Sequence, residues 1–182
     1  MLDLSDAELV KRAQGGDVNA VGALYDRYQA RIFRYVQSRV FDGRLAEDLT
    51  GEIFMRMVIN LPSYRATGAP FASWLYRIAR NLVVDHHRKE GNFMSLPIEY
   101  VANMHDGRQH NPAPVVERQL EMERIQLALE RIDEMQREVI RLRFLVGLSL
   151  QEVAETLDKT VAAVKSLQHR GLLALRVALK LQ

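Results

Sequence analysis

The chain lacks cysteine altogether and has little glycine and proline, with 10 and 5 residues of these types among 182. The absence of cysteine excludes disulfides, thiolate metal sites and cysteine nucleophiles, and it is typical of proteins from a reducing compartment. Few helix-breaking residues, together with stretches rich in Leu, Ala, Arg and Glu, favour helix over strand. Hydrophobic residues make up 48% of the chain, which is enough to build a core. We therefore expect an all-α protein.

Long apolar runs are also missing. No stretch approaches the roughly 20 residues that a membrane-spanning helix needs. The N-terminal sequence MLDLSDAELVKR is acidic and then amphipathic, which is unlike a signal peptide. The sequence thus predicts a cytoplasmic protein with no membrane insertion.

A large excess of either charge is absent, since the formal net charge is only +2. The basic residues are nevertheless unevenly placed. Residues 159–182 hold five basic residues and no acidic one, and residues 61–90 hold five Lys or Arg against two acids. Two basic stretches on an otherwise balanced chain predict two phosphate-facing surfaces, although solvated helix faces would give the same pattern.

Apolar residues recur at steps of three and four through most of the first 90 residues, which is the spacing of amphipathic helices. The pattern predicts a four-helix domain over residues 1–90, with helices over about 5–14, 17–40, 45–61 and 71–89. Ser5 and Glu8 have the spacing of a capping box at the first helix. In the fourth helix, the spacing turns five polar side chains toward solvent or the rim, namely Arg77, Arg80, Asn81, Arg88 and Lys89.

The helical pattern stops over residues 91–116, which hold three of the five prolines and are predicted to be an interdomain linker. It resumes in a second predicted domain, residues 117–182. Capping residues and apolar spacing predict four helices there, over about 117–131, 133–147, 149–157 and 160–179. In the second of these helices, we expect Val139, Leu142 and Phe144 to face the core.

Residues 149–172 have the pattern of a helix-turn-helix: a short capped helix, a tight turn and a longer helix with a basic outer face. The first turns of such a second helix enter the major groove, where base edges can be distinguished. Lys165 and Arg170 can bind phosphates or guanine, and Gln168 can pair with adenine. The alternative is an ordinary helical hairpin with a charged face.

Four segments of the chain are similar, in order, to conserved segments of one family. They are DAELVKRAQGGDVNAVGALYDRY (6–28), AEDLTGEIFMRM (46–57), YRATGAPFASWLYRIARNLVVDHHRK (64–89), and VIRLRFLVGLSLQEVAETL (139–157) with AVKSLQHRGL (163–172). On these segments the chain resembles the extracytoplasmic-function (ECF) sigma factors of the sigma-70 superfamily. The resemblance implies a promoter-specificity subunit of bacterial RNA polymerase rather than an enzyme, with no cofactor and no metal. The implied partners are the core polymerase, promoter DNA as duplex and melted strand, and an anti-sigma factor.

The resemblance also assigns candidate residues to three surfaces. Those implied for minus-ten DNA are Tyr64, Arg65, Trp74, Arg77, Arg80, Asn81, Arg88 and Lys89. Those implied for minus-thirty-five DNA are Lys159, Thr160, Lys165, Ser166, Gln168, His169 and Arg170. Those implied for the core polymerase are Glu47, Asp48, Leu49, Glu52, Ile53 and Phe54. Aromatic and amide groups beside a cationic rim can capture unstacked bases, which suits the first set.

Two of these assignments leave an alternative open. Trp74 matches a family tryptophan at the boundary of duplex and bubble, whereas its helical spacing alone predicts a core residue. The acids around Glu47 fit a basic partner, but they also fit a solvated acidic face above a buried Leu and Ile stripe.

Two rival functions are also compatible with parts of the sequence. Asp85, His86 and His87 suggest a metal-dependent phosphoesterase, but adjacent histidines on a helix point about 100° apart. A stand-alone helix-turn-helix repressor or activator that binds an operator as a dimer would share the second domain. It would leave residues 1–90 without a role unless they form a sensor.

Overall fold

The computed structural model describes residues 4–66, 69–89 and 124–180. Within these ranges the regular elements are all helices, which confirms the predicted all-α class. The predicted linker over 91–116 lies outside the described residues, as does the first part of the helix predicted over 117–131. The division of the chain at this linker therefore stays a prediction.

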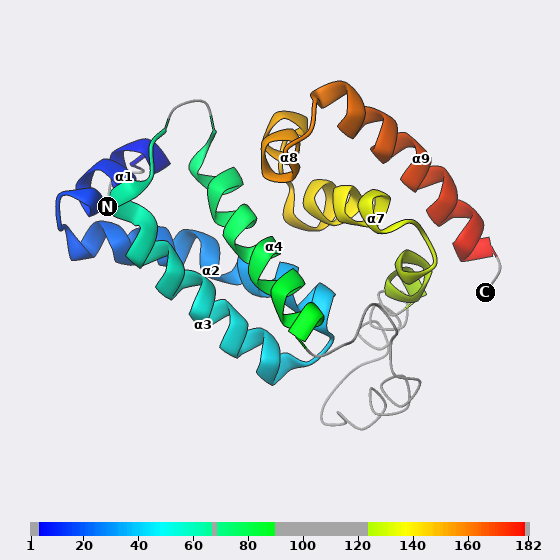
Figure 1. Ribbon diagram of the computed structural model, residues 1–182, viewed down its shortest axis with the longest axis horizontal. Helices are drawn as coiled ribbons and strands as arrows, with labels where there is room; N and C mark the ends of the chain where they lie inside the picture. Colours follow the sequence, from blue (N-terminus) through cyan, green and yellow to red (C-terminus); the bar gives the residue numbers. More distant parts are fainter. Residues whose placement is uncertain (1–3, 67–68, 90–123, 181–182) are drawn as a thin grey trace, which may run out of the picture.

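The first domain consists of four α-helices and a short 3-10 turn. They are α1 (Asp6–Gln14), α2 (Val18–Val40), α3 (Gly43–Asn60), η1 (Leu61–Ser63) and α4 (Phe71–Lys89) (Figure 1). Side-chain caps begin the first three helices: Ser5 forms a full capping box with Glu8, and Asp17 and Asp42 accept hydrogen bonds from first-turn amides. The four predicted helices are confirmed, with boundaries that agree to within two residues.

The core of this domain lies between α2, α3 and α4. Its fully buried side chains include Ile32, Ile53 and Leu75, one from each of these helices. Tyr35 and Tyr76 meet edge to face, with ring centroids 5.6 Å apart, a favourable geometry for two aromatic rings. This packing fixes the rotation of α4 and so determines which of its polar side chains reach the surface.

The second domain contains α7 (Glu134–Ile140), η2 (Arg141–Val146), α8 (Leu150–Leu157) and α9 (Val161–Lys180), and residues 124–130 are also helical. Asp133 caps α7 by accepting from the amides of Met135 and Gln136. The following segment, η2, is a π-helical turn, and its wider turn rotates side chains away from their α-helical positions. The prediction for Phe144 is therefore wrong: its side chain is 56% exposed.

Helices α8 and α9 form the predicted helix-turn-helix. Ser149 and Glu152 make a full capping box at α8, and the Thr160 hydroxyl accepts from the amide of Ala163 at the start of α9. Asp158 has a left-handed backbone, φ 52°, which lets the chain turn between the two helices. Ala154 and Val164 are buried where the helices pack, as the sequence predicts.

A close contact between α7 and α9 depends on Gly171. A Cβ atom at this position would lie 3.0 Å from Ile140 Cδ1 and 3.1 Å from Gln136 Cβ. We expect Gly171→Val to lower the free energy of unfolding by about 1–3 kcal/mol, because overfilling a packed contact forces side chains and backbone apart. Urea denaturation followed by circular dichroism measures this change.

The matched control is Gly51→Val on α3, because nothing lies within 4 Å of a Cβ atom built at Gly51. Valine and glycine differ by only a few tenths of a kcal/mol in helix propensity, so the control should leave stability nearly unchanged. Equal effects at the two positions would contradict the close packing of α9 on α7.

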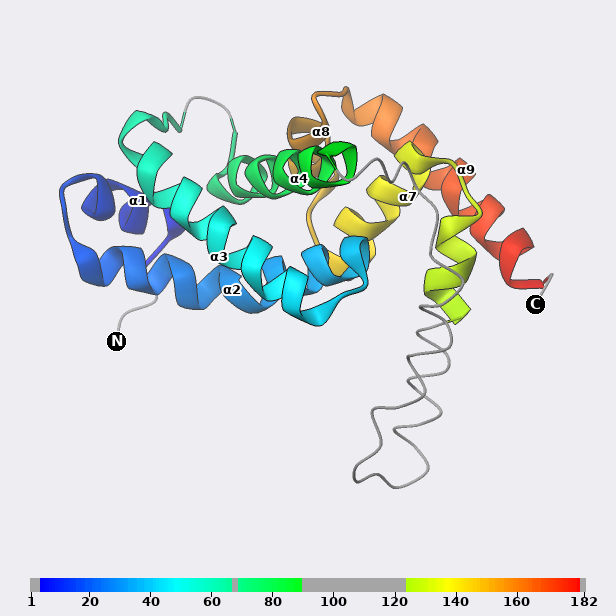
Figure 2. The ribbon, with the colours of Figure 1, turned by 60° about the horizontal axis from the view of Figure 1, so that its bottom comes forward.

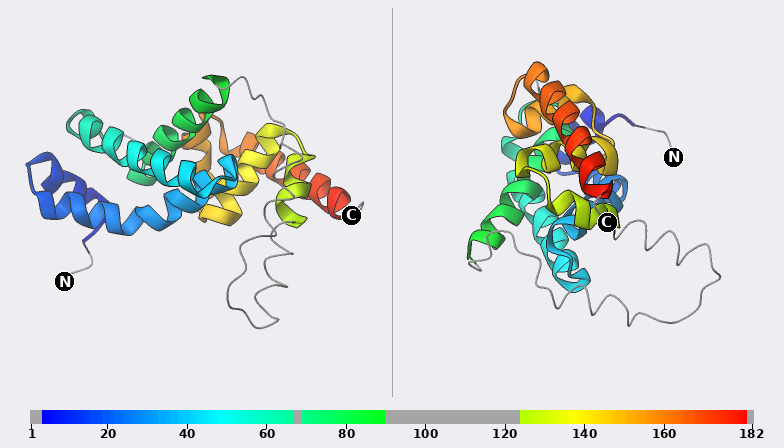
Figure 3. Two further views of the ribbon diagram at one scale, coloured as in Figure 1. Left: turned by 90° about the horizontal axis from the view of Figure 1, so that it is seen from below. Right: turned by 90° about the vertical axis from the view of Figure 1, so that its right-hand side faces the viewer.

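The two domains pack directly against each other. α4 lies along α8, and α2 contacts η2 (Figure 2). Buried apolar residues of both domains, including Leu75 and Val153, belong to one continuous cluster. As a result the molecule is elongated, with α1 and the end of α9 at opposite ends (Figure 3).

Candidate nucleic-acid interface

The outer face of α9 gathers most of the residues predicted to contact minus-thirty-five DNA. Lys159, Lys165, Ser166, His169 and Arg170 are exposed. The face has no acidic residue, because none occurs from Lys159 to Gln182. A basic face at the start of a second helix is suited to the phosphates and base edges of a major groove.

Thr160 and Gln168 have further roles in this face. The Thr160 hydroxyl already caps α9, so its first contribution is to the helix itself. Gln168 is half-buried, and its side-chain oxygen accepts a hydrogen bond of 3.1 Å from Arg143 Nε. Because Arg143 engages the side-chain oxygen, the amide nitrogen is the group of Gln168 that we expect to contact DNA.

Sequence reasoning missed Arg143. Its guanidinium also donates to the backbone carbonyl of Leu148, just before α8, so it joins η2, the start of the helix-turn-helix and α9. The only available signal was a basic residue within an apolar segment. The π-helical turn that orients the Arg143 side chain could not be predicted from the spacing of apolar residues.

The exposed face of α4 carries the polar residues predicted for minus-ten DNA. Arg77, Asn81, Arg88 and Lys89 are exposed and Arg80 is half-buried. Arg77, Asn81 and Arg88 are spaced four and seven residues apart, so they share one side of the helix. The side chain of Arg88 also pairs with Asp85 at 3.1 Å, which helps to orient it.

The aromatic residues before and within α4 are packed together rather than open. Tyr64 is buried, its hydroxyl donates to the carbonyl of Ala69 at 2.9 Å, and its ring lies 4.8 Å from that of Trp74. Burial raises the pKa of the Tyr64 hydroxyl, so it stays protonated. Trp74 is half-buried against Phe71, which fits a core residue with one accessible edge. Arg65 is exposed, and Gly68 of the adjoining loop lies outside the described residues.

The residues predicted for the core polymerase divide into two groups. Glu47 and Asp48 are exposed, and Glu52 is half-buried and pairs with Arg56 at 2.6 Å. Leu49, Ile53 and Phe54, in contrast, belong to the buried core. These three side chains follow the stripe that faces α2 and α4, so they are not accessible to a partner in this conformation.

A different apolar group on α3 is exposed. Met55, Val58 and Ile59 are 64%, 47% and 68% exposed, and Asp48 and Glu52 lie on the same side of the helix as Met55 and Ile59 at four- and seven-residue steps. The sequence already indicated this group, because Met55, Val58 and Ile59 are apolar but do not belong to the core stripe, whose residues are spaced four apart. We call Glu47, Asp48, Met55, Val58 and Ile59 the α3 surface.

The residues that suggested metal chemistry do not gather into a metal site. Within the described residues, no group of three or more His, Asp or Glu could hold a metal ion. His87 Nε2 lies 3.2 Å from the carbonyl of Arg39, so this histidine links α4 to the end of α2. None of the described helices is long and apolar enough to cross a membrane.

Comparison with known proteins agrees with this geometry. Residues 24–93 match the model of sigma-70 region 2, and residues 128–177 match that of sigma-70 region 4. The first match contains α3 and α4, and the second contains the helix-turn-helix.

Individual relatives are similar over both domains. The chain is 36% identical to the ECF RNA polymerase sigma factor BldN of Streptomyces coelicolor, over 90% of this chain and 62% of BldN. It is 32% identical to the ECF RNA polymerase sigma factor SigW of Bacillus subtilis, over 94% of this chain and 95% of SigW. The structure of CnrH in complex with the cytosolic domain of CnrY is similar with a TM-score of 0.75 and 25% identity, over 97% of this chain and 98% of the other. This chain therefore belongs to the ECF family of RNA polymerase sigma factors.

Proposed function

We propose that this chain directs bacterial core RNA polymerase to promoters as a non-catalytic subunit in the cytoplasm. α9 reads the minus-thirty-five duplex and α4 binds the minus-ten element and helps to open it. The observation that carries this proposal is the pair of exposed polar faces on α4 and α9, within segments that match sigma-70 regions 2 and 4. Two such faces on one chain suit a protein that binds two promoter elements.

The α3 surface is the proposed contact with the core polymerase. Exposed Met55, Val58 and Ile59 can be buried by a partner, while Glu47 and Asp48 at one edge pair with its basic residues. The buried Leu49, Ile53 and Phe54 act indirectly, by holding α3 in place. A contact with the core polymerase gives the apolar and the acidic residues of this surface a shared role, which fits the sigma-factor function.

An anti-sigma factor is the proposed regulatory partner. CnrH, which is similar to this chain over both domains, was solved in complex with the cytosolic domain of CnrY. A protein that covers promoter-binding surfaces of this chain would prevent initiation until it is released.

Asn81 provides a direct test of the role of α4. Its amide is exposed between Arg77 and Arg88, where it can hydrogen-bond the edge of an unstacked base. We expect Asn81→Ala in the holoenzyme to reduce promoter opening roughly tenfold, because one good base contact contributes about 1–3 kcal/mol. Permanganate footprinting of unpaired thymines measures opening, and a gel-shift assay measures closed-complex binding, which should change much less.

The matched control for this experiment is Asn19→Ala, an exposed asparagine on α2 far from α4 in the sequence. It should leave both the footprint and the closed complex as in the wild type. A wild-type footprint for Asn81→Ala would remove this residue from the minus-ten surface.

A further inference from the structure

The last residue of α1 holds the segment that leads into α4. Gln14 Nε2 donates to the backbone carbonyls of Leu61 and Tyr64, at 2.9 and 2.8 Å. A side-chain amide carries two N–H groups, so one Gln14 side chain can make both hydrogen bonds at once. The two carbonyls lie at the start of η1 and directly after its end. Gln14 therefore fixes the shape of this turn.

Helix α1 is itself firmly placed on the domain. The carboxylate of Asp6, in its first turn, pairs with Arg27 of α2 at 2.5 Å and accepts a hydrogen bond from the Tyr28 hydroxyl. Leu9 buries the apolar side of the helix in the core. Because its helix cannot move freely, the Gln14 side chain extends from a fixed support.

The segment that Gln14 holds carries Arg65, one of the residues predicted for minus-ten DNA. Arg65 Nη1 donates to the carbonyls of Pro62 and Tyr64, at 3.1 and 3.3 Å. The Tyr64 carbonyl thus accepts from Gln14 and Arg65 together, through its two lone pairs. Arg65 is exposed, so a bound strand can reach its guanidinium. A shift of the Tyr64 carbonyl would move this guanidinium as well.

The same tyrosine contacts the aromatic residues of α4. The Tyr64 ring lies 4.8 Å from that of Trp74 and 5.9 Å from that of Phe71. Phe71 in turn meets Tyr28 edge to face, with ring centroids 5.5 Å apart. Tyr28 is the residue that binds Asp6 at the start of α1. Both ends of α1 are therefore connected to the aromatic cluster that includes the accessible edge of Trp74.

We infer that Gln14 is a positioning residue for promoter opening, which makes α1 a part of the minus-ten apparatus. Gln14 acts through the segment after η1, where it keeps Arg65 and the edge of Trp74 in the arrangement that receives the unpaired strand. A segment that is ordered before binding loses less conformational entropy when it captures the strand. The inference rests on the proposed function, because it assigns Gln14 a role in the opening step.

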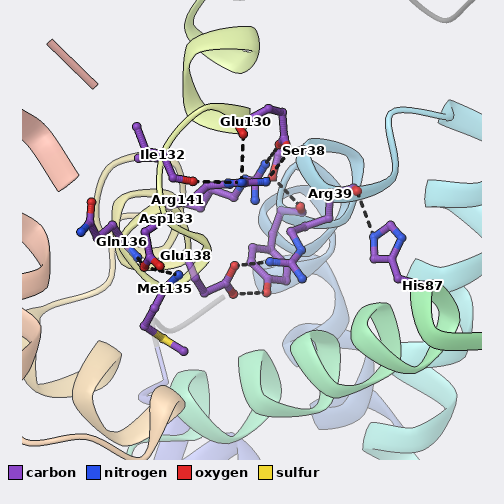
Figure 4. A network of polar contacts seen from close by, with 12 residues as sticks. Ser38, Arg39, His87, Glu130, Ile132, Asp133, Met135, Gln136, Glu138 and Arg141 are labelled. Carbon is purple, nitrogen blue, oxygen red and sulfur yellow. Dashed lines mark hydrogen bonds and ion pairs between the residues drawn. The ribbon is translucent and has the colours of Figure 1, made fainter. Parts of the chain in front are cut away.

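A role of Gln14 in geometry can be separated from a role in folding. The residue is exposed, and methionine and glutamine have nearly the same helix propensity. The buried network that joins Tyr35 and Arg39, toward the other end of α2, to Glu138 of α7 has no contact with this site (Figure 4). Variants at position 14 should therefore fold as the wild type does.

Gln14→Met tests the inference in the holoenzyme formed with the full chain. The substitution keeps the length of the side chain and removes both N–H donors. We expect promoter opening, measured by permanganate footprinting, to fall roughly fivefold, because each ordinary hydrogen bond makes a modest net contribution. Closed-complex affinity, affinity for core polymerase and helix content should stay as in the wild type. The matched control, Gln29→Met at an exposed position of α2, should leave all of these unchanged.

Gln14→Lys is a second variant, which supplies donors in place of the amide. A lysine ammonium has three N–H groups, so it can donate to the Leu61 and Tyr64 carbonyls. We expect opening near the wild-type level. Gln29→Lys adds the same charge elsewhere and so measures any general attraction to DNA. Opening by Gln14→Lys no better than by Gln14→Met would contradict the positioning role.

A double-mutant cycle shows whether Gln14 acts through Arg65. If it does, Gln14→Met combined with Arg65→Ala should lose little more opening than the more severe single variant, because the two residues share one carbonyl. Effects that multiply would mean that the two residues act independently, against the inference.

The outcomes separate this inference from the proposed function. A wild-type footprint for Gln14→Met would overturn the positioning role, as would an equal loss of opening, closed-complex affinity and core affinity. Absence of opening by the wild-type chain with core polymerase would instead refute the proposed function.

Discussion

Replacing Lys165 and Arg170 together by alanine is expected to weaken binding of minus-thirty-five duplex DNA by about a hundredfold, since each such contact contributes about 1–3 kcal/mol. Both side chains are exposed on α9, beyond the turn of the helix-turn-helix. Each lost phosphate contact should also reduce the slope of affinity against salt concentration by about one. Fluorescence anisotropy of the holoenzyme on a labelled duplex, measured at several salt concentrations, gives both quantities.

The matched control removes the two other cations of the same helix, Arg176 and Lys180. Both are exposed but lie at the C-terminal end of α9, away from the first turns, which are proposed to enter a groove. Their replacement by alanine should change affinity severalfold at most. Unchanged affinity in the Lys165 and Arg170 variant would mean that α9 is not the recognition helix.

Glu130→Ala is expected to lower the free energy of unfolding of the second domain by about 3–5 kcal/mol, which is the cost of leaving a buried charge without its partner. The Glu130 carboxylate pairs with two buried guanidiniums, those of Arg137 and Arg141. Burial, followed by the nearby Arg39, lowers the pKa of Arg141, so this guanidinium is already unfavourably placed. Removal of Glu130 leaves two buried positive charges close together.

Chemical denaturation of the full chain, followed by circular dichroism, measures this effect. Glu130→Gln keeps a hydrogen-bond acceptor but loses the charge, so it should fall between the wild type and Glu130→Ala. Glu134→Ala removes an exposed carboxylate at the start of α7 and should cost less than about 1 kcal/mol. A loss below 1 kcal/mol in Glu130→Ala would show that the arginines do not depend on this carboxylate.

Local features of the sequence were sufficient to predict the helices and their ends. The capping boxes at Ser5 and Ser149 involve residues three apart, so their geometry follows directly from the pattern. The helix-turn-helix was predictable for the same reason, because its turn and the buried Ala154 and Val164 lie within one short segment.

The errors came from features that local spacing does not contain. Phe144 is exposed because η2 is a π-helical turn, whereas its predicted position assumed an α-helix throughout. On α3 the alternative of a buried stripe holds for Leu49 and Ile53, whereas the exposed Met55 and Ile59 were not singled out from the sequence. Burial of one face is decided by what packs on it, which for α3 is α2 and α4.

The contact between the domains was not predictable at all. Glu138 and Tyr35 are 103 residues apart, and nothing in the sequence around either residue indicates the other. A buried carboxylate within α7 could have been matched with any of 25 Lys and Arg residues. Only the three-dimensional arrangement shows that its partners come from α2.

Transcription with purified components tests the central claim most directly. Core RNA polymerase alone and core polymerase with the full chain would each transcribe the same fragmented genomic DNA, and the run-off products would be compared. The sigma-factor function predicts discrete transcripts with defined start sites only when the chain is present. A chain that binds duplex DNA tightly without core polymerase, and never yields a discrete transcript with it, would contradict that function and favour a stand-alone helix-turn-helix regulator.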